Sequence, residues 1–573
     1  MSLTLPRRGA AARSRSLSPS GDRFVYVLAL PVVLVLLLFV TVPMLHTAVS
    51  SAGGDGLAAN YRGFLSGTSG TALLLSVTLS LGSVLTCGVI GTLLAVLLNR
   101  FDFPGRRVLE VLAMVPMALP PLIGSVSFVL LYSETGIVPR VLHSAFGADP
   151  ATFSVGGVTG VLLVHTFTMY PYFYLSVSAG LAGLDNSLES AAANLGASRA
   201  RIWRTVVLPM LTPALVSGAL LTFMISMASF TAPQLYNVQT LTMQIVSSRT
   251  SGNQELAAAQ ATALSVVSVL FLVAMRWYQS RRVHRSLSKG VQRDRTHARG
   301  PARYAALAGS ALLSLVLLAP VLVLALLSFS VDGSWTTQIL PGDYSTDNYR
   351  TIFTDPASLL PISVSVQMSL LATLAAVLIG AAASWVLARW RRAGRTVLDI
   401  MVMLPWALPG TVIGVNLVTA FAEPQASNLG LTLVGTLWIL PVAYFVRYVP
   451  LVFRSTNAAL DQIDPSLEEA AGNLGASPLR VLRTVTMPLV MRGVLAGALL
   501  AFVDGVGEYV ASVVIYPAGF TPMSVEIYNR IYSSQFGSAA AYGTLQVVLI
   551  LAVLALSNRV QSGRRGLEAA PAN

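Results

Sequence analysis

Charged side chains are scarce in this sequence. Asp, Glu, Lys and Arg make up 11% of its 573 residues, whereas 54% are hydrophobic. Soluble globular proteins carry about 25% charged residues, so the composition excludes a soluble protein and indicates one embedded in a lipid bilayer. The net charge of +13 is distributed as membrane topology requires, and we therefore expect no nucleic-acid partner.

Cysteine, histidine and lysine are also scarce, and each scarcity excludes a class of site. The single cysteine, Cys87, excludes an intrachain disulfide, and the five histidines lack the spacing of a metal site. A phosphate-binding P-loop needs Gly-Lys followed by Ser or Thr, whereas the only lysine, Lys289, follows Ser288 and precedes Gly290. We therefore predict a protein that is not an enzyme, with no cofactor and no metal on this chain.

Long hydrophobic runs are present instead. A spanning helix needs about 20 mainly apolar residues, and the ten-residue alternation of a transmembrane barrel strand is absent. We predict an all-α polytopic membrane protein. Its twelve expected spans lie near 24–46, 70–98, 108–133, 157–181, 206–232, 256–277, 304–328, 360–388, 397–421, 431–452, 485–515 and 539–559, the fifth and eleventh being the least regular.

The positions of the basic residues predict the orientation. Most of the 37 Lys and Arg residues fall in loops on the same side as the N-terminus, and such loops remain in the cytoplasm. We therefore expect a multi-pass protein of the cell membrane with both termini cytoplasmic. No small-residue cleavage site follows the first apolar run, so this run is predicted to be a retained span rather than a signal peptide.

A 25-residue segment occurs twice, at 185–209 and 464–488, and 16 of its positions are identical at an offset of 279 residues. The runs 115–120 and 404–409 also match, as do Asn60-Tyr61 and Asn348-Tyr349. We predict two homologous six-helix halves, 24–278 and 304–559. A cytoplasmic linker at 279–303 joins them, and cytoplasmic tails at 1–23 and 560–573 flank them. Parallel repeats of this kind favour a transport pathway at their interface.

Each copy of the segment predicts a short helix, a glycine turn and a second short helix on the cytoplasmic side. Asp464 followed by Pro465 suits a helix start, and Gly475 suits a helix stop. Alanine-rich faces allow close approach of a partner, and Glu and Arg supply ion pairs at the rim. The candidate docking residues are Asp185, Glu189, Ser190, Ala191, Ala192, Gly196, Arg201, Arg204 and Pro209 in the first copy, and Asp464, Glu468, Glu469, Ala470, Ala471, Gly475, Arg480, Arg483 and Pro488 in the second.

The segment resembles the EAA loop of binding-protein-dependent ABC importer permeases. Glu469 is followed by two alanines and, six residues later, by Gly475, whereas the first copy has Ser190 in place of the motif's Glu, directly after Glu189. The resemblance covers nearly the whole chain as two fused permease domains with a type I importer-like fold. It implies that the loops dock on a homodimeric ABC ATPase, which binds ATP and Mg, and that an extracytoplasmic binding protein delivers the solute.

Fused permeases of this kind resemble ferric-iron and thiamine importers, within a group that includes polyamine, sulfate and phosphonate systems. The Gly-Glu-Tyr-Val-Ala run at 507–511 is similar to a Gly-Glu-Phe-Gly-Ala-like stretch of that group. We expect ferric iron, with thiamine, polyamine, sulfate or phosphonate as alternatives. A secondary transporter would also have internal repeats but would place coupling-ion ligands at the midplane. A membrane enzyme would need a nucleophile–base pair, and none is apparent.

Two acidic residues fall inside the eleventh predicted span. Asp504 and Glu508 are four residues apart and are therefore expected on one helical face, and acidic residues in spans usually face a cavity. Their counterparts in the first half, Ile225 and Ser229, are neutral. Either the acidic pair lines the pathway, where it attracts a cation or binds a gate residue, or it reaches interfacial water or an arginine such as Arg447.

Proline occurs at matching places in the third and ninth spans. Pro120 and Pro409 each follow Ala-Leu, and a proline inside a span removes a backbone hydrogen bond and kinks the helix. A membrane tolerates this where neighbouring groups or water satisfy the freed carbonyl. The pair therefore either shapes the bundle or belongs to a pore or gate.

Overall fold

The computed structural model describes residues 19–53, 57–147, 149–184, 186–282, 296–297, 300–335, 338–390 and 394–568. The predicted site residue Asp185, most of the N-terminal tail and of the linker, and 569–573 of the C-terminal tail lie outside the described residues. Helices account for nearly all of the described secondary structure, and the all-α polytopic prediction is confirmed. The one described sheet is a parallel pair of two-residue strands, β1 (Phe101–Asp102) and β2 (Thr296–His297).

The helices before the linker are α1 (Pro19–Leu36), η1 (Leu37–Thr41), α2 (Val42–Ser50), α3 (Leu57–Ser66), α4 (Thr68–Arg100), α5 (Arg106–Leu112), α6 (Val115–Ala118), α7 (Pro121–Tyr132), α8 (Ile137–Phe146), α9 (Pro150–Phe153), α10 (Gly157–Ala182), α11 (Asn186–Asn194), α12 (Arg199–Ile202), η2 (Trp203–Val207), α13 (Leu208–Met227), α14 (Thr231–Leu235), α15 (Leu241–Thr250) and α16 (Gln254–Arg282).

The helices after the linker are α17 (Pro301–Leu327), α18 (Asp347–Thr354), α19 (Pro356–Arg389), α20 (Arg395–Ala407), α21 (Gly410–Phe421), η4 (Ala426–Asn428), α22 (Ile439–Leu460), α23 (Pro465–Asn473), α24 (Pro478–Val481), η5 (Leu482–Thr486), α25 (Met487–Val506), α26 (Ser512–Ile515), α27 (Met523–Tyr532) and α28 (Phe536–Glu568).

Nine stretches of the described residues are helical, long and apolar enough to cross a membrane, and a bent pair, α20 with α21, makes up to ten. The two predicted spans missing from this set correspond to α10 and α22. Both helices lie among other helices, and buried polar or aromatic side chains such as His165 and Tyr444 lower their hydropathy. The tenth span was predicted at 431–452, but its helix begins at Ile439.

Proline breaks two of the predicted spans. The ninth bends by 113° between α20 and α21, where Leu408 and Pro409 are extended. The third is divided into α5, α6 and α7, with the same break at Leu119 and Pro120. A proline ring crowds the preceding turn of a helix and supplies no N–H, and the matching Ala-Leu-Pro runs have matching breaks.

Each half contains a closely packed group of three helices. α10 packs against α4 and α13, and α22 packs against α19 and α25. A Cβ atom added to Gly91 of α4 would lie 2.6 Å from the carbonyl oxygen of Tyr170, and one added to Gly497 of α25 would lie 2.7 Å from the Cα of Val452. Only glycine fits at these two crossings, since small residues let membrane helices approach closely.

The first helix of each half packs on the other half. α1 contacts α19 and α20, α2 contacts α21, and α17 contacts α5 and α7. Val32 and Leu36 of α1 thus share a hydrophobic core with Leu398 and Val402 of α20. The two halves of the sequence are therefore interwoven in space through their first helices.

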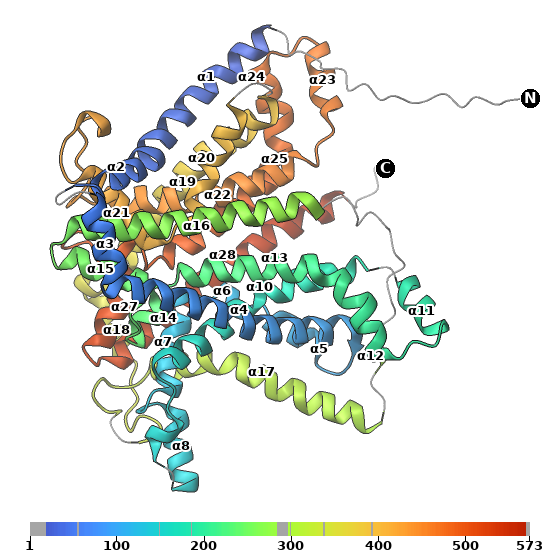
Figure 1. Ribbon diagram of the computed structural model, residues 1–573, viewed down its shortest axis with the longest axis vertical. Helices are drawn as coiled ribbons and strands as arrows, with labels where there is room; N and C mark the ends of the chain where they lie inside the picture. Colours follow the sequence, from blue (N-terminus) through green and yellow to red (C-terminus); the bar gives the residue numbers. More distant parts are fainter. Residues whose placement is uncertain are drawn as a thin grey trace, which may run out of the picture.

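The long helices run between two ends of the molecule. Figure 1 shows α11, α12, α23 and α24 at one end, which we call the repeat end, and α3, α15, α18 and α27 at the other, which we call the opposite end. α1 contacts α24, so the described chain starts at the repeat end. Both copies of the repeated segment therefore lie on the same side of the bundle.

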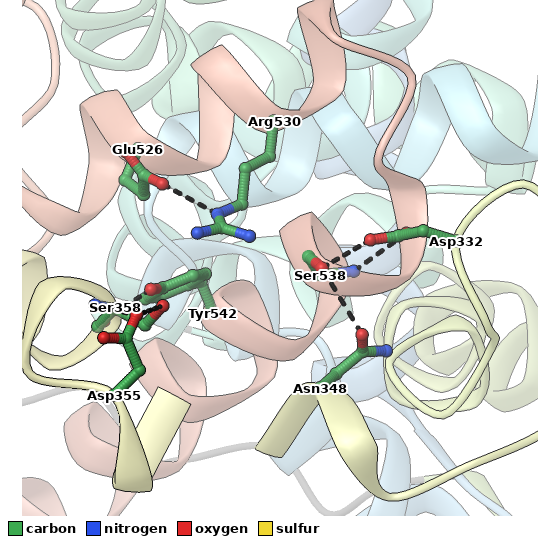
Figure 2. Close-up of polar contacts among 8 residues, drawn as sticks. All are labelled: Asp332, Asn348, Asp355, Ser358, Glu526, Arg530, Ser538 and Tyr542. Atoms are coloured by element: carbon green, nitrogen blue, oxygen red, sulfur yellow. Dashed lines mark hydrogen bonds and ion pairs between the residues drawn. The ribbon is translucent and has the colours of Figure 1, made fainter. Parts of the chain in front are cut away.

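Polar side chains hold the opposite end of the second half together (Figure 2). Asp332 accepts hydrogen bonds from the backbone N–H groups of Gly537 and Ser538 at the start of α28, at 2.7 and 3.2 Å. Asn348 donates to the carbonyl oxygens of Ser328 and Ser330 at 3.0 and 2.8 Å.

The first half repeats the asparagine part of this arrangement. Asn60 donates to the carbonyl oxygens of Ser51 and Gly53 at 3.0 and 2.9 Å. Asn60 and Asn348 thus each hold the chain that leaves the first span of their half. The repeated Asn-Tyr pair therefore has a shared structural role at the opposite end.

Candidate functional site

The two copies of the repeated segment fold alike. Asp464 caps α23 and accepts a hydrogen bond from the backbone N–H of Ser466 at 2.9 Å. That bond, together with the Ser466 side chain, lowers the pKa of the exposed Asp464 carboxyl below its ordinary value. Ser198 and Ser477 cap α12 and α24 in the same way, each at 3.4 Å from the nitrogen three residues on. The predicted helix, glycine turn and second helix are confirmed.

Glycine makes the turn in both copies. Gly196 has φ +79° and Gly475 has φ +85°, a conformation that other residues adopt only at a cost. The N–H of Ala197 then reaches the carbonyl of Ala192, and that of Ala476 reaches the carbonyl of Ala471, both at 3.1 Å. These bonds satisfy carbonyl groups that the end of a helix leaves without an intrahelical partner.

The residue before each glycine projects away from the protein. Leu195 is 88% exposed and Leu474 is 89% exposed, more than any other large hydrophobic side chain of the described residues. The predicted arginines at 201, 204, 480 and 483 are exposed as well, as are Pro209 and Pro488, while Ala192 and Ala471 are half-buried beside exposed Ala191 and Ala470. An exposed leucine with arginines close by suits contact with another protein.

An ion pair ties each copy to the bundle. Glu189 accepts two hydrogen bonds from Arg100 at the end of α4, at 3.0 and 2.5 Å, and both side chains are largely buried. Glu468 accepts a hydrogen bond from Arg389 at the end of α19 and also a 2.5 Å hydrogen bond from Thr486. The first glutamate of each copy therefore faces inward.

The two copies differ on the surface, at the position of the motif's own glutamate. Ser190 and Glu469 are both exposed, so the departure from the EAA pattern in the first copy leaves the inward ion pair intact. It changes only the outer face of α11.

A cavity of about 310 Å³ is lined by residues of both halves. The Pro120 break of the first half lines it, as do α10, α13, α22 and α25. Pro409 does not line it; the following residue, Gly410, packs against the guanidinium of Arg447, which a Cβ there would meet at 2.2 Å. The two Leu-Pro elements thus make similar breaks beside the same cavity, which Leu119 and Leu408 both line, but only the proline of the first half lines it.

Glu508 and Asp504 both line this cavity, but not from one helix as predicted. α25 ends at Val506 before Gly507, and the carboxylate of Glu508 turns back to accept a 2.7 Å hydrogen bond from the N–H of Ala511. Glu508 is 4% exposed and pairs with Arg447 at 2.8 Å. The oxygen that pairs with Arg447 also accepts a hydrogen bond from Tyr448.

The matching wall of the first half is neutral. Thr168, Met169, Ile225 and Ser229 line the cavity where Arg447, Tyr448, Asp504 and Glu508 stand in the second half. Ser229 instead lies 2.8 Å from Nε2 of His165 in a buried network. The charge asymmetry noticed in the sequence is therefore an asymmetry of the cavity wall.

The halves also touch directly beside the cavity. Tyr509 donates a 2.5 Å hydrogen bond to Gln234 of the first half, and a Cβ on Gly507 would lie 3.1 Å from the ring of Pro120. Tyr509 and Gly507 lie in the segment that follows α25, Gln234 lies in the segment that follows α13, and Pro120 lies at the break before α7. Nothing in the sequence paired Tyr509 with Gln234.

Sequence reasoning also missed Leu195, Leu474, Arg100 and Arg389. The two leucines belong to the repeated Leu-Gly pair, which indicated only a helix stop. The two arginines end the second span of each half, and this matched placement was the available signal. No group of three metal-ligating side chains occurs within the described ranges.

Comparisons with known proteins agree with these features. The family model of the binding-protein-dependent transport system inner membrane component matches residues 88–285 and again 372–566. A probable ABC transporter permease protein of Sinorhizobium fredii is 29% identical over 501 residues, which cover 86% of this chain and 88% of that protein. An Fe(3+)-transport system permease protein of Haemophilus influenzae is 27% identical over 483 residues, covering 83% and 88%.

A shorter relative matches one half. A probable sulfate transport system permease protein of Nephroselmis olivacea is 31% identical over 232 residues, covering 39% of this chain and 81% of that protein. The family model, by contrast, falls once in each half and together spans more than half of the chain. The chain therefore belongs to the binding-protein-dependent ABC importer permeases, with two permease domains fused in one chain.

Proposed function

We propose that this permease subunit imports ferric iron, delivered by a binding protein at the opposite end and driven by a homodimeric ABC ATPase at the repeat end. The proposed ATPase contact rests on one observation. The two repeated loops fold alike, and each presents a nearly fully exposed leucine. Both are tied to the bundle by a buried glutamate. Such a loop can transmit movement because it is anchored on one side and open to a partner on the other.

Ferric iron is supported by the extent of the matches. Relatives named for ferric transport match 83% and 93% of this chain, whereas those named for sulfate and 2-aminoethylphosphonate transport match 39% and 41%. The matches to the ferric relatives thus extend over both halves of this chain, which supports a ferric substrate. Thiamine and polyamines stay alternatives, and a secondary transporter has no support from these relatives.

We propose that the chain spans the cell (inner) membrane and that its repeat end faces the cytoplasm. The excess of Arg in the loops of that end supports this orientation, and both termini would then be cytoplasmic. ATP and Mg would bind to the partner ATPase only.

The cavity at the interface is proposed as part of the translocation pathway, with Pro120, Asp504 and Glu508 on its wall. Closure of the ATPase dimer would draw the two loops together, and the halves would rock between access from one end and from the other. Pro409 would act indirectly, through the helix break that positions Gly410 against Arg447.

Copurification tests the ATPase contact. A tagged full-length chain should retain an ATP-binding subunit after solubilisation, and Leu474→Ser should reduce the recovered ATPase because an apolar anchor is lost. The matched control is Phe146→Ser, which removes a 76% exposed side chain at the opposite end. Equal recovery with wild type and Leu474→Ser, or equal loss in both variants, would count against docking at the loops.

A further inference from the structure

The two carboxylates on the cavity wall, Glu508 and Asp504, differ in the partners that they have. Both carboxylate oxygens of Glu508 have partners: one pairs with Arg447 and accepts a hydrogen bond from Tyr448, and the other accepts one from the N–H of Ala511. Glu508 is also almost completely buried. This glutamate is therefore a fixed structural partner of Arg447, and its charge is cancelled locally.

Asp504 is different. It lines the same cavity, its side chain is accessible there, and within the described ranges its carboxylate has no hydrogen-bond or ion-pair partner. Arg447 lies nearby, but its guanidinium is already bound to Glu508. With Asp504 ionised, the three groups sum to one negative charge, and the neutral wall of the first half adds none.

We infer that Asp504 selects for cations in the translocation pathway, so that the solute crosses this cavity as a cation and not as an oxyanion. This rests on the proposed function and deepens it. A cation that enters a cavity inside the membrane loses hydration, and an unpaired carboxylate replaces part of that interaction. An anion such as sulfate would lose hydration and also be repelled.

Pseudo-symmetry provides a way to separate charge from structure. Ile225 occupies the matching position in the first half and also lines the cavity. An aspartate placed there restores a negative charge to the same cavity from the other wall. If Asp504 acts through its charge, the transplanted carboxylate will compensate; if Asp504 holds the structure, it will not.

The experiment measures uptake of radiolabelled ferric iron, thiamine and sulfate in a strain lacking the gene and complemented with full-length variants, with protein amounts followed by immunoblot. We expect gene-dependent uptake of ferric iron or thiamine, and a loss of about tenfold or more in initial rate for Asp504→Asn. Asp504→Glu should keep most of the rate. The double variant Ile225→Asp with Asp504→Asn should recover several-fold over Asp504→Asn alone.

Asp343→Asn, a change at an exposed loop position, is the matched control and should transport as wild type. Undiminished cation uptake by Asp504→Asn, gene-dependent sulfate uptake, or no recovery in the double variant at wild-type protein levels would each overturn the inference. Copurification of the ATPase is independent of Asp504. A chain that binds the ATPase but imports sulfate would therefore refute cation selection while leaving the permease role intact, whereas failure to bind any ATPase would refute the docking proposal.

Discussion

Removing the buried glutamate of one loop should loosen that loop and leave the other unchanged. In Glu189→Gln the side chain keeps its size but loses the charge that faces Arg100. The two atom pairs are 3.0 and 2.5 Å apart, and the side chains are 13% and 12% exposed. At such a site the attraction between charge centres about 4 Å apart is about 4 kcal/mol with an effective dielectric constant near 20.

Desolvation and side-chain ordering offset most of that attraction, which leaves about 1–2 kcal/mol for the pair. A loss of about 1.4 kcal/mol raises the population of the undocked loop about tenfold. The effect should be larger for Glu468→Gln. In the first half Arg100 also stacks on Trp203 of η2 at 4.5 Å, a link to the loop that survives the substitution, whereas Arg389 stacks on Trp385 of its own helix.

Hydrogen–deuterium exchange on the purified full-length protein measures this opening directly. Peptides from 186–207 should exchange about tenfold faster in Glu189→Gln, with peptides from 465–486 unchanged; Glu468→Gln should show the reverse pattern. Ser190→Ala, which alters the neighbouring exposed side chain, serves as the control. Unchanged exchange in the altered loop, or an equal increase in both loops, would refute the reasoning from separate ion pairs.

Three further results are expected. Gly475→Ala should cost about 1 kcal/mol, because its φ of +85° is unfavourable for a residue with a Cβ; exchange at the end of α23 should rise, and Gly472→Ala, within the helix, should not raise it. The pKa of the Asp464 carboxyl should lie below 3.8. Its helix-capping hydrogen bond is therefore complete above that pH and is lost as the pH falls through the lowered pKa. Carboxyl NMR should show that Ser466→Pro raises this pKa. Tyr509→Phe should weaken the bond between the halves by about 1 kcal/mol and increase maleimide labelling of a cysteine introduced at Ser229, whereas Tyr516→Phe should leave labelling unchanged.

Local signals in the sequence were sufficient for the repeated loops. Asp464, Gly475 and Ser477 each act within a few residues, through caps and a left-handed turn, and the structure has them in those roles. The breaks at Pro120 and Pro409 were visible for the same reason, since a proline acts on its own helix. The role of the loops in docking was inferred from the repeated polar segment and from the family resemblance, and it stays a proposal.

The sequence by itself determined the all-α membrane class, the two related halves and the form of the loops, because composition, periodicity and caps depend on neighbours along the chain. Only the tertiary structure decided which charges meet. In the structure Glu189 pairs with Arg100, Glu508 rather than Asp504 pairs with Arg447, and α1 packs on the other half. Such pairings depend on how helices distant in sequence cross, and no local pattern records that.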